Sequence, residues 1–146
     1  MKKITRYISI ILVLSLLFAF SAYAESTVEP KGSAFFGSYG TDLYKTSSTS
    51  FQIWFDVDAN VTTMQELGAS EIVLYRSTDR QTWSQIKLYQ KGVYPQMIAY
   101  NTASHAGYVP YNFATSGYYY TARITFYAKN STGIGERDIY TEVLKM

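Results

Sequence analysis

From Ser33 to the end of the chain, hydrophobic and polar positions alternate with a period of two, and long helical patterns are absent. A period of two turns successive side chains to opposite faces of a β-strand. The stretch FQIWFDVD, which begins at Phe51, alternates in this way. It predicts a strand whose core face consists of Phe51, Ile53, Phe55 and Val57, with Trp54 on the outward face.

The longest alternation runs over residues 118–129. One face of this predicted strand holds Tyr120, Ala122, Ile124, Phe126 and Ala128, and the other holds Tyr119, Thr121, Arg123, Thr125 and Tyr127. Further strands are expected over residues 72–76, 84–90 (with Ile86 and Leu88 on one face) and 137–145, and less regular ones around residues 35–44 and 106–113.

One short segment carries a helical signal. Thr63 and Glu66 have the spacing of a capping box, in which the threonine side chain accepts a hydrogen bond from the glutamate amide. Gly68 stands at a suitable position just after the end of such a turn. The pattern predicts a single helical turn here, crossing between two strands.

Many short strands separated by turns rich in Gly, Asn, Ser and Thr indicate an all-β fold. We expect an antiparallel β-sandwich with one short helical turn. Periodicity alone leaves a closed antiparallel barrel open as the alternative. No internal repeat with a solenoid or propeller period occurs.

The first 24 residues have the composition of a secretory signal peptide. Basic residues precede an apolar run from Ile8 to Phe20, and Ala22-Tyr23-Ala24 offers small residues at a cleavage site. We expect cleavage after Ala24, secretion, a flexible tail over residues 25–32 and one domain over residues 33–146. The Met-Lys-Lys start is typical of bacterial leaders, and we identify no LPxTG-type sorting signal.

Cleavage changes the charge balance of the chain. The leader holds three of the 13 Lys and Arg residues and none of the 11 acidic residues, so the net charge changes from +2 to −1. This balance argues against nucleic acid or an anionic membrane as the partner. The chain has no cysteine, so a secreted domain of this size relies on its hydrophobic core.

The C-terminal third resembles a fibronectin type III domain. The stretch YYYTARITFYAKNSTGIGE is similar to strand F and the F–G turn of that family. The resemblance implies an immunoglobulin or fibronectin type III-like sandwich, and a tyrosine corner in which Tyr118 or Tyr120 bonds upstream backbone. Asn130 and the following glycines suit the positive φ angles of a tight hairpin. The interval from Tyr120 to Ala128 is longer than in the family.

The whole mature chain also resembles small secreted proteins of Gram-positive anaerobes that carry a single domain of unknown function. The stretches that carry this resemblance are TMQELGASEIVLYRSTDRQTW, Tyr94-Pro95-Gln96-Met97 and GYYYTARITFYA. It implies secretion and a β-rich fold, and it brings no known activity.

The stretch RSTDRQTW resembles the Asp-box of sialidase-type propellers. It lacks the glycine of that motif, is one residue shorter and occurs once, whereas Asp-boxes recur with each blade. Because predicted strands flank it, we interpret residues 77–83 as a hairpin connection. Asp79 suits an Asx-turn, and Trp83 suits packing across the hairpin.

Two candidates for chemistry are weak. Asp56, Asp58 and Asn60 have the spacing of an EF-hand loop, but the loop then lacks its glycine and its final glutamate, so at most a looser Ca²⁺ site remains. His105 is the only histidine, with Ser104 and Ser116 as conceivable nucleophiles, but no G-x-S-x-G elbow is present. We interpret His105 as a loop residue, and predict no cofactor and no catalytic site.

Outward-facing aromatic residues are the positive feature. Parity turns Tyr119, Arg123 and Tyr127 to one face of their strand, and Tyr75 joins them if its strand pairs alongside. Trp, Tyr and Arg are favoured at binding hot spots, and flat aromatic rings stack on sugars. The candidate binding face is therefore Tyr75, Tyr119, Arg123, Tyr127 and Trp54. The same residues also favour β-strands for structural reasons alone.

These observations favour a secreted, non-catalytic binding module whose partner is a protein or a cell-surface glycan. The alternative is a structural surface protein that self-associates through exposed strand edges. A hydrolase with an unrecognised site is the least favoured class. The ligand and the oligomeric state do not follow from the sequence.

Overall fold

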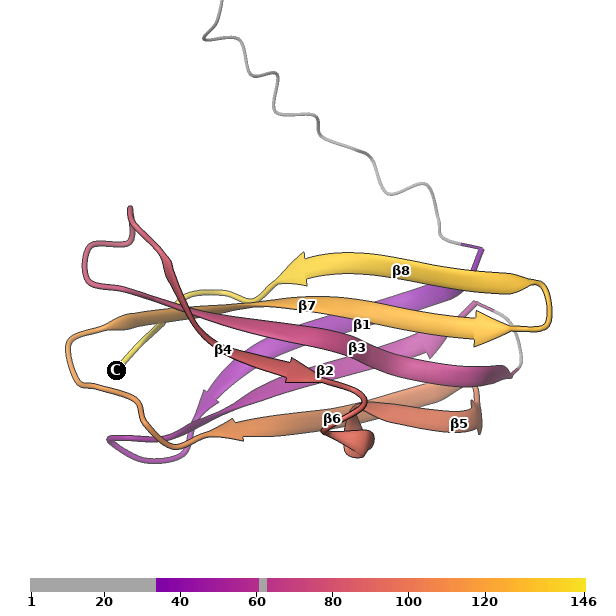
Figure 1. Ribbon diagram of the computed structural model, residues 1–146, viewed down its shortest axis with the longest axis horizontal. Helices are drawn as coiled ribbons and strands as arrows, with labels where there is room; N and C mark the ends of the chain where they lie inside the picture. Colours follow the sequence, from indigo (N-terminus) through magenta and orange to yellow (C-terminus); the bar gives the residue numbers. More distant parts are fainter. Residues whose placement is uncertain (1–33, 61–62) are drawn as a thin grey trace, which may run out of the picture. The chain divides into compact units, whose positions relative to one another are not determined.

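A computed structural model describes residues 34–60 and 63–146, and they form two antiparallel sheets packed face to face (Figure 1). The predicted signal peptide and N-terminal tail lie outside the described residues. The three-stranded sheet has the order β1-β2-β6, where β1 is Phe36–Lys45, β2 is Phe51–Ala59 and β6 is Ser104–Tyr111.

The six-stranded sheet is built on the path β4-β3-β7-β8. These strands are Ser84–Gln90, Met64–Ser77, Tyr119–Asn130 and Gly133–Tyr140 respectively. Two short strands extend it, since β5 (Ile98–Thr102) pairs with β3 and β9 (Leu144–Lys145) pairs with β7. A single 3₁₀ turn, η1 (Pro95–Met97), precedes β5.

The core lies between the sheets, and the two strongest alternating patterns contribute much of it. On β2 the predicted core residues are at most 1% exposed, and on β7 the five predicted core residues are fully buried. Both predicted parities are confirmed. The three-stranded sheet contributes mainly large side chains and β7 contributes alternating large and small ones, so the inner faces interdigitate.

The predicted all-β sandwich is confirmed, because the strands form two separate sheets rather than one closed barrel. The arrangement is compatible with immunoglobulin and fibronectin type III-like sandwiches. β3 and β7 pair antiparallel over most of their length, as strands C and F do in fibronectin type III domains.

The tyrosine corner is formed by Tyr120. Its ring is fully buried, and its hydroxyl accepts a hydrogen bond from the Thr115 amide, 2.8 Å away and five residues upstream. In the β7–β8 hairpin the expected positive φ occurs at Gly133, at +158°, and not at Asn130. Instead its side-chain oxygen accepts hydrogen bonds from the amides of Thr132 and Gly133 at 2.8 and 3.1 Å.

The helical turn predicted at Thr63 is wrong in its position. Residues 64–77 form β3, and the 3₁₀ turn lies at Pro95–Met97. Gly68 is a strand glycine and not a helix terminus. It lies where β5 approaches β3, and a β-carbon there would contact the Met97 carbonyl oxygen. Pairing of β3 with both β5 and β7 therefore overrides the local helical pattern.

On β4 the buried residue is Tyr89, at 2% exposure. Ile86 is half-buried and Leu88 is 39% exposed. The Tyr89 hydroxyl donates a hydrogen bond to the Pro110 carbonyl at 2.9 Å, and burial raises the pKa of this phenol. A tyrosine that reaches a backbone acceptor is thus more deeply buried at this edge than the aliphatic residues beside it.

Candidate binding faces

The hairpin turn after β3 is held by the side chains of the stretch that resembles an Asp-box. One carboxylate oxygen of Asp79 accepts hydrogen bonds from the amides of Gln81 and Thr82 at 2.8 and 2.9 Å and from the Ser77 hydroxyl at 2.9 Å. The amides of Thr82 and Gln81 hold the pKa of Asp79 below its ordinary value. The interpretation of this stretch as a turn is confirmed.

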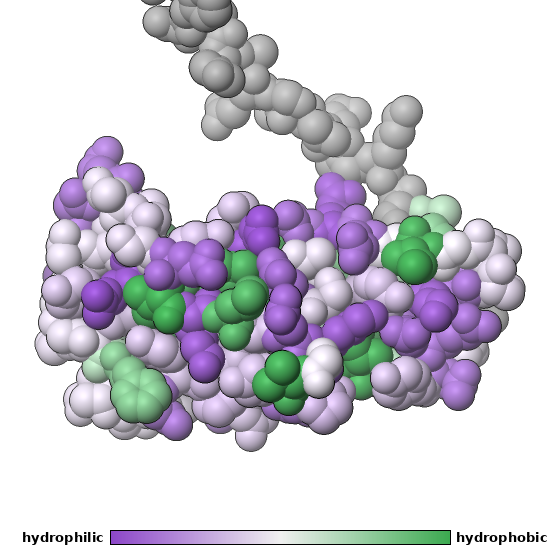
Figure 2. Space-filling model, viewed as in Figure 1, coloured by the Kyte–Doolittle hydropathy of each residue, from purple (hydrophilic) through white to green (hydrophobic). Residues whose placement is uncertain are grey.

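Four of the five candidate residues share the outward face of the six-stranded sheet. Register places Tyr75 opposite Thr121 and Val73 opposite Arg123 across the β3–β7 pair. Tyr119, Arg123 and Tyr127 follow on alternate positions of β7. Figure 2 shows this side of the molecule, where polar side chains surround separate hydrophobic patches.

Arg123 is engaged within this face. Its guanidinium donates to Glu71 at 2.7 Å on β3 and lies 3.6 Å from Asp138 on β8. The Nε atom is buried and has no hydrogen-bond partner among the described residues. Because two carboxylates neutralise it, Arg123 serves mainly to join β3, β7 and β8.

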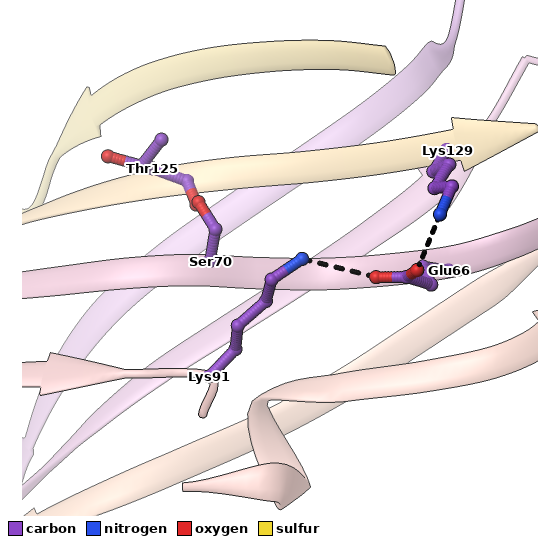
Figure 3. A network of polar contacts seen from close by, with 5 residues as sticks. All are labelled: Glu66, Ser70, Lys91, Thr125 and Lys129. Carbon is purple, nitrogen blue, oxygen red and sulfur yellow. Dashed lines mark hydrogen bonds and ion pairs between the residues drawn. The ribbon is translucent and has the colours of Figure 1, made fainter. Parts of the chain in front are cut away.

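Tyr127 is only 7% exposed because Lys91 covers it, with the ammonium 3.5 Å from the ring centroid. Lys91 and Lys129 also donate to Glu66 at 3.1 and 3.2 Å (Figure 3). The hydrogen bond from Lys91, supported by Lys129, holds the pKa of Glu66 below its ordinary value. This network leaves Tyr127 little surface for a ligand.

Tyr119 stays half-exposed and lies near two cations. The Arg80 guanidinium is 5.6 Å and the Lys145 ammonium 5.4 Å from its ring centroid. Neither cation has an ion pair among the described residues. Tyr119 and its cations therefore form a positively charged margin of this face.

Tyr75 lines a depression of about 460 Å³ on the same face. Trp83 and Tyr140 form its other aromatic walls. Thr121 and Thr141 also line it, but they are buried and their hydroxyls bond each other and the backbone. Sequence reasoning missed Trp83 and Tyr140 as site residues. The only signal for Tyr140 is its register opposite Arg123, which requires the β7–β8 pairing.

Trp54 does not join this face, because it lies on the three-stranded sheet. It is 40% exposed and packs on Tyr108 of β6, with ring centroids 5.0 Å apart and planes tilted by 31°. The pair lines a groove of about 700 Å³ beside β6. The candidate residues are thus divided between two opposite faces of the sandwich.

His105 lies in strand β6 rather than in the expected loop, and it is half-buried. Its ring packs against Phe55, and Nε2 donates to the Gln96 carbonyl at 3.0 Å. No hydrogen bond joins it to Ser104 or Ser116 in the described part of the chain. Among residues 34–60 and 63–146, no three His, Cys, Asp or Glu side chains gather as metal ligands.

No protein-family model matches this sequence, and no curated protein matches it significantly. Within the described residues, no helix has the length and apolar character to cross a membrane. The candidate faces are therefore interpreted from their own geometry.

Proposed function

We propose that the protein is a secreted, non-catalytic binding module that binds its partner through the outward face of the six-stranded sheet. The observation that carries this proposal is the depression walled by Tyr75, Trp83 and Tyr140. Its aromatic walls suit a ligand that buries apolar surface against them.

The candidate residues have different roles in the proposed site, because their contacts differ. Tyr75 and the 61% exposed Tyr140 are the anchors. Arg123, tied to Glu71 and Asp138, holds the strands beneath them in register. Tyr119, with Arg80 and Lys145, forms a charged rim. An aromatic centre with a polar margin is typical of protein–protein hot spots, which favours a protein partner.

The test compares retention of partners from cell-wall and whole-cell extracts by immobilised mature protein. The variant Tyr75→Ala/Tyr140→Ala should lose the partner that the wild type retains, since removing one such anchor typically costs about 2 kcal/mol. Tyr100→Ala is the matched control, because Tyr100 is 68% exposed on β5 and does not line the depression. Equal retention by both variants would contradict the assigned face.

Secretion is part of the proposal and rests on the N-terminal sequence. The secreted protein should begin at Glu25, after the small residues of the cleavage site. Intact-mass spectrometry of culture supernatant measures this directly. A secreted chain that begins before Ala22 would contradict the signal peptide.

A further inference from the structure

The groove beside Trp54 forms a second surface. It shares no lining residue with the depression of the proposed partner site, and Gln96 of η1 and Ile98 of β5 complete its lining. It runs along β6, the last strand of the three-stranded sheet. Trp54 and Tyr108 form its aromatic part. Gln96 and His105 contribute polar groups. Ala106 and Gly107 also line it, and these small residues fill little of the groove.

The aromatic pair is held in place before any ligand arrives. The Trp54 indole donates a hydrogen bond to the Gln52 side chain at 2.9 Å, and its ring packs on Tyr108. The two side chains remain 40% and 43% exposed. Because the rings are already fixed, a ligand loses little side-chain entropy when it packs on them.

Small residues allow a ligand to approach the backbone next to the rings. Asp56 lies opposite Gly40 on β1 and Ala106 on β6, and its carboxylate leans over Gly40, where a β-carbon would meet it. At Gly107 a β-carbon would lie 2.8 Å from the Phe55 ring. The Phe55 ring thus occupies the space where a side chain at position 107 would begin.

The outward face of the three-stranded sheet carries negative charge. Asp42, Asp56 and Asp58 point outward from β1 and β2, and Asp56 has no hydrogen bond or ion pair with the other described residues. Asp56 and Asp58 pair with Ala106 and Ser104 on β6, and Asp42 pairs with Trp54 on β2. The face therefore offers hydrogen-bond acceptors and repels anions.

We propose that this groove binds a glycan built from pyranose rings without acidic groups. A pyranose presents a face of C–H bonds that packs on an aromatic ring. Its hydroxyls donate to acceptors beside the groove, such as Asp56, which lies opposite the lining residue Ala106. The carboxylates disfavour uronic, sulfated or phosphorylated chains.

The first experiment measures binding of hexasaccharides by tryptophan fluorescence. Trp83→Phe is the background, so that Trp54 alone reports among the tryptophans of the chain. Neutral cello- and manno-hexaose, the N-acetylglucosamine hexamer and the glucosamine hexamer cover the proposed class, and at least one should bind. The galacturonic acid hexamer should not bind, and the lysine hexamer tests for a site that merely attracts cations.

The second experiment locates the bound sugar by calorimetry. Trp54→Ala should weaken the best hexasaccharide by about tenfold or more, the loss expected of a central aromatic anchor. Asp56→Asn should weaken it less, and Tyr100→Ala should leave it unchanged. Unchanged circular dichroism would establish that each variant is folded. Tyr75→Ala/Tyr140→Ala should also bind the sugar normally, which separates this site from the partner site.

Several results would overturn the glycan site. These are no binding of any neutral or amino hexasaccharide at millimolar concentration, binding of the lysine hexamer as tight as that of the best sugar, or preferential binding of the galacturonic acid hexamer. Unchanged affinity in a folded Trp54→Ala variant would do the same.

Discussion

At the scale of single residues, an outward direction does not by itself make a tyrosine available to a ligand. Tyr75 and Tyr127 both point outward from the six-stranded sheet, but Lys91 covers Tyr127 and leaves it 7% exposed. Tyr75 has no such cover and lines an open depression. The difference arises from Lys91, which directly follows β4. Its ammonium binds Glu66 on β3 and lies over the ring of Tyr127 on β7.

Glu66 should make stability depend on acid pH. Its pKa is lowered in the folded protein, so the stabilisation is present above the unfolded-state pKa near 4.5 and is lost as pH falls through the folded value. Glu66→Gln should cost up to about 1 kcal/mol at neutral pH and less at low pH. Urea unfolding at a series of pH values measures this.

Glu136→Gln is the matched control for that measurement. Glu136 lies on the same face, opposite Tyr127, without an ion pair among the described residues. It should change stability little. If Glu66→Gln and Glu136→Gln have identical pH profiles, the Lys91–Glu66–Lys129 network does not stabilise the fold.

Tyr120→Phe should remove the tyrosine corner while the buried ring is kept. The Thr115 amide then loses its acceptor, which typically costs about 1 to 2 kcal/mol. Tyr118→Phe is the control, because Tyr118 interacts through its ring with Arg76. In denaturant unfolding, Tyr120→Phe should have a lower midpoint than Tyr118→Phe, while the dependence of the unfolding free energy on denaturant concentration stays the same. A larger loss for Tyr118→Phe would contradict the corner.

At the scale of elements, the sequence predicts those strands best whose two faces differ most. β2 and β7 alternate between core and surface, so their parity follows from residue types alone. The first half of β3 and all of β5 escaped prediction, because TMQELG matches a capping pattern and the β3–β5 contact depends on residues about thirty positions apart. The candidate site was predicted only in part, because some of its contacts also depend on pairing between distant strands. Tyr140, Trp83 and Tyr108 acquire their neighbours from strand pairing, which no single segment encodes.

Gly68→Ala should test the crowded crossing of β3 and β5. A methyl group would meet the Met97 carbonyl oxygen, and φ at this position is +152°, which L-residues rarely adopt. We expect a loss of about 2 kcal/mol or more in unfolding free energy. Gly92→Ala is the matched control, since nothing lies within 4 Å of a β-carbon there. Equal melting temperatures would show that β5 is free to move away from β3.

At the scale of the whole molecule, the two outer faces carry different chemistry. On the six-stranded sheet, tyrosines support cations, as at Tyr119 and Tyr127. On the three-stranded sheet, Trp54 and Tyr108 adjoin carboxylates that form no ion pair with the other described residues. Tyrosine thus serves three purposes here, as a core residue with a hydrogen-bonding hydroxyl, as a support for cations and as an exposed anchor. Two separate sites would allow the proposed protein partner and the proposed glycan to be bound at once.

The proposed binding module should be a monomer in solution, whereas a self-associating surface protein would assemble through its strand edges. The edges visible here are poorly suited to pairing. β8 presents Glu136, Arg137 and Asp138 in succession, β1 begins with an irregularity between Phe36 and Ser38, and β6 carries Pro110 near its end. Light scattering of the mature protein should give the mass of one chain over a wide range of concentration. Mass that rises with concentration, and falls when Ile134 of β8 is replaced by Lys, would favour self-association instead.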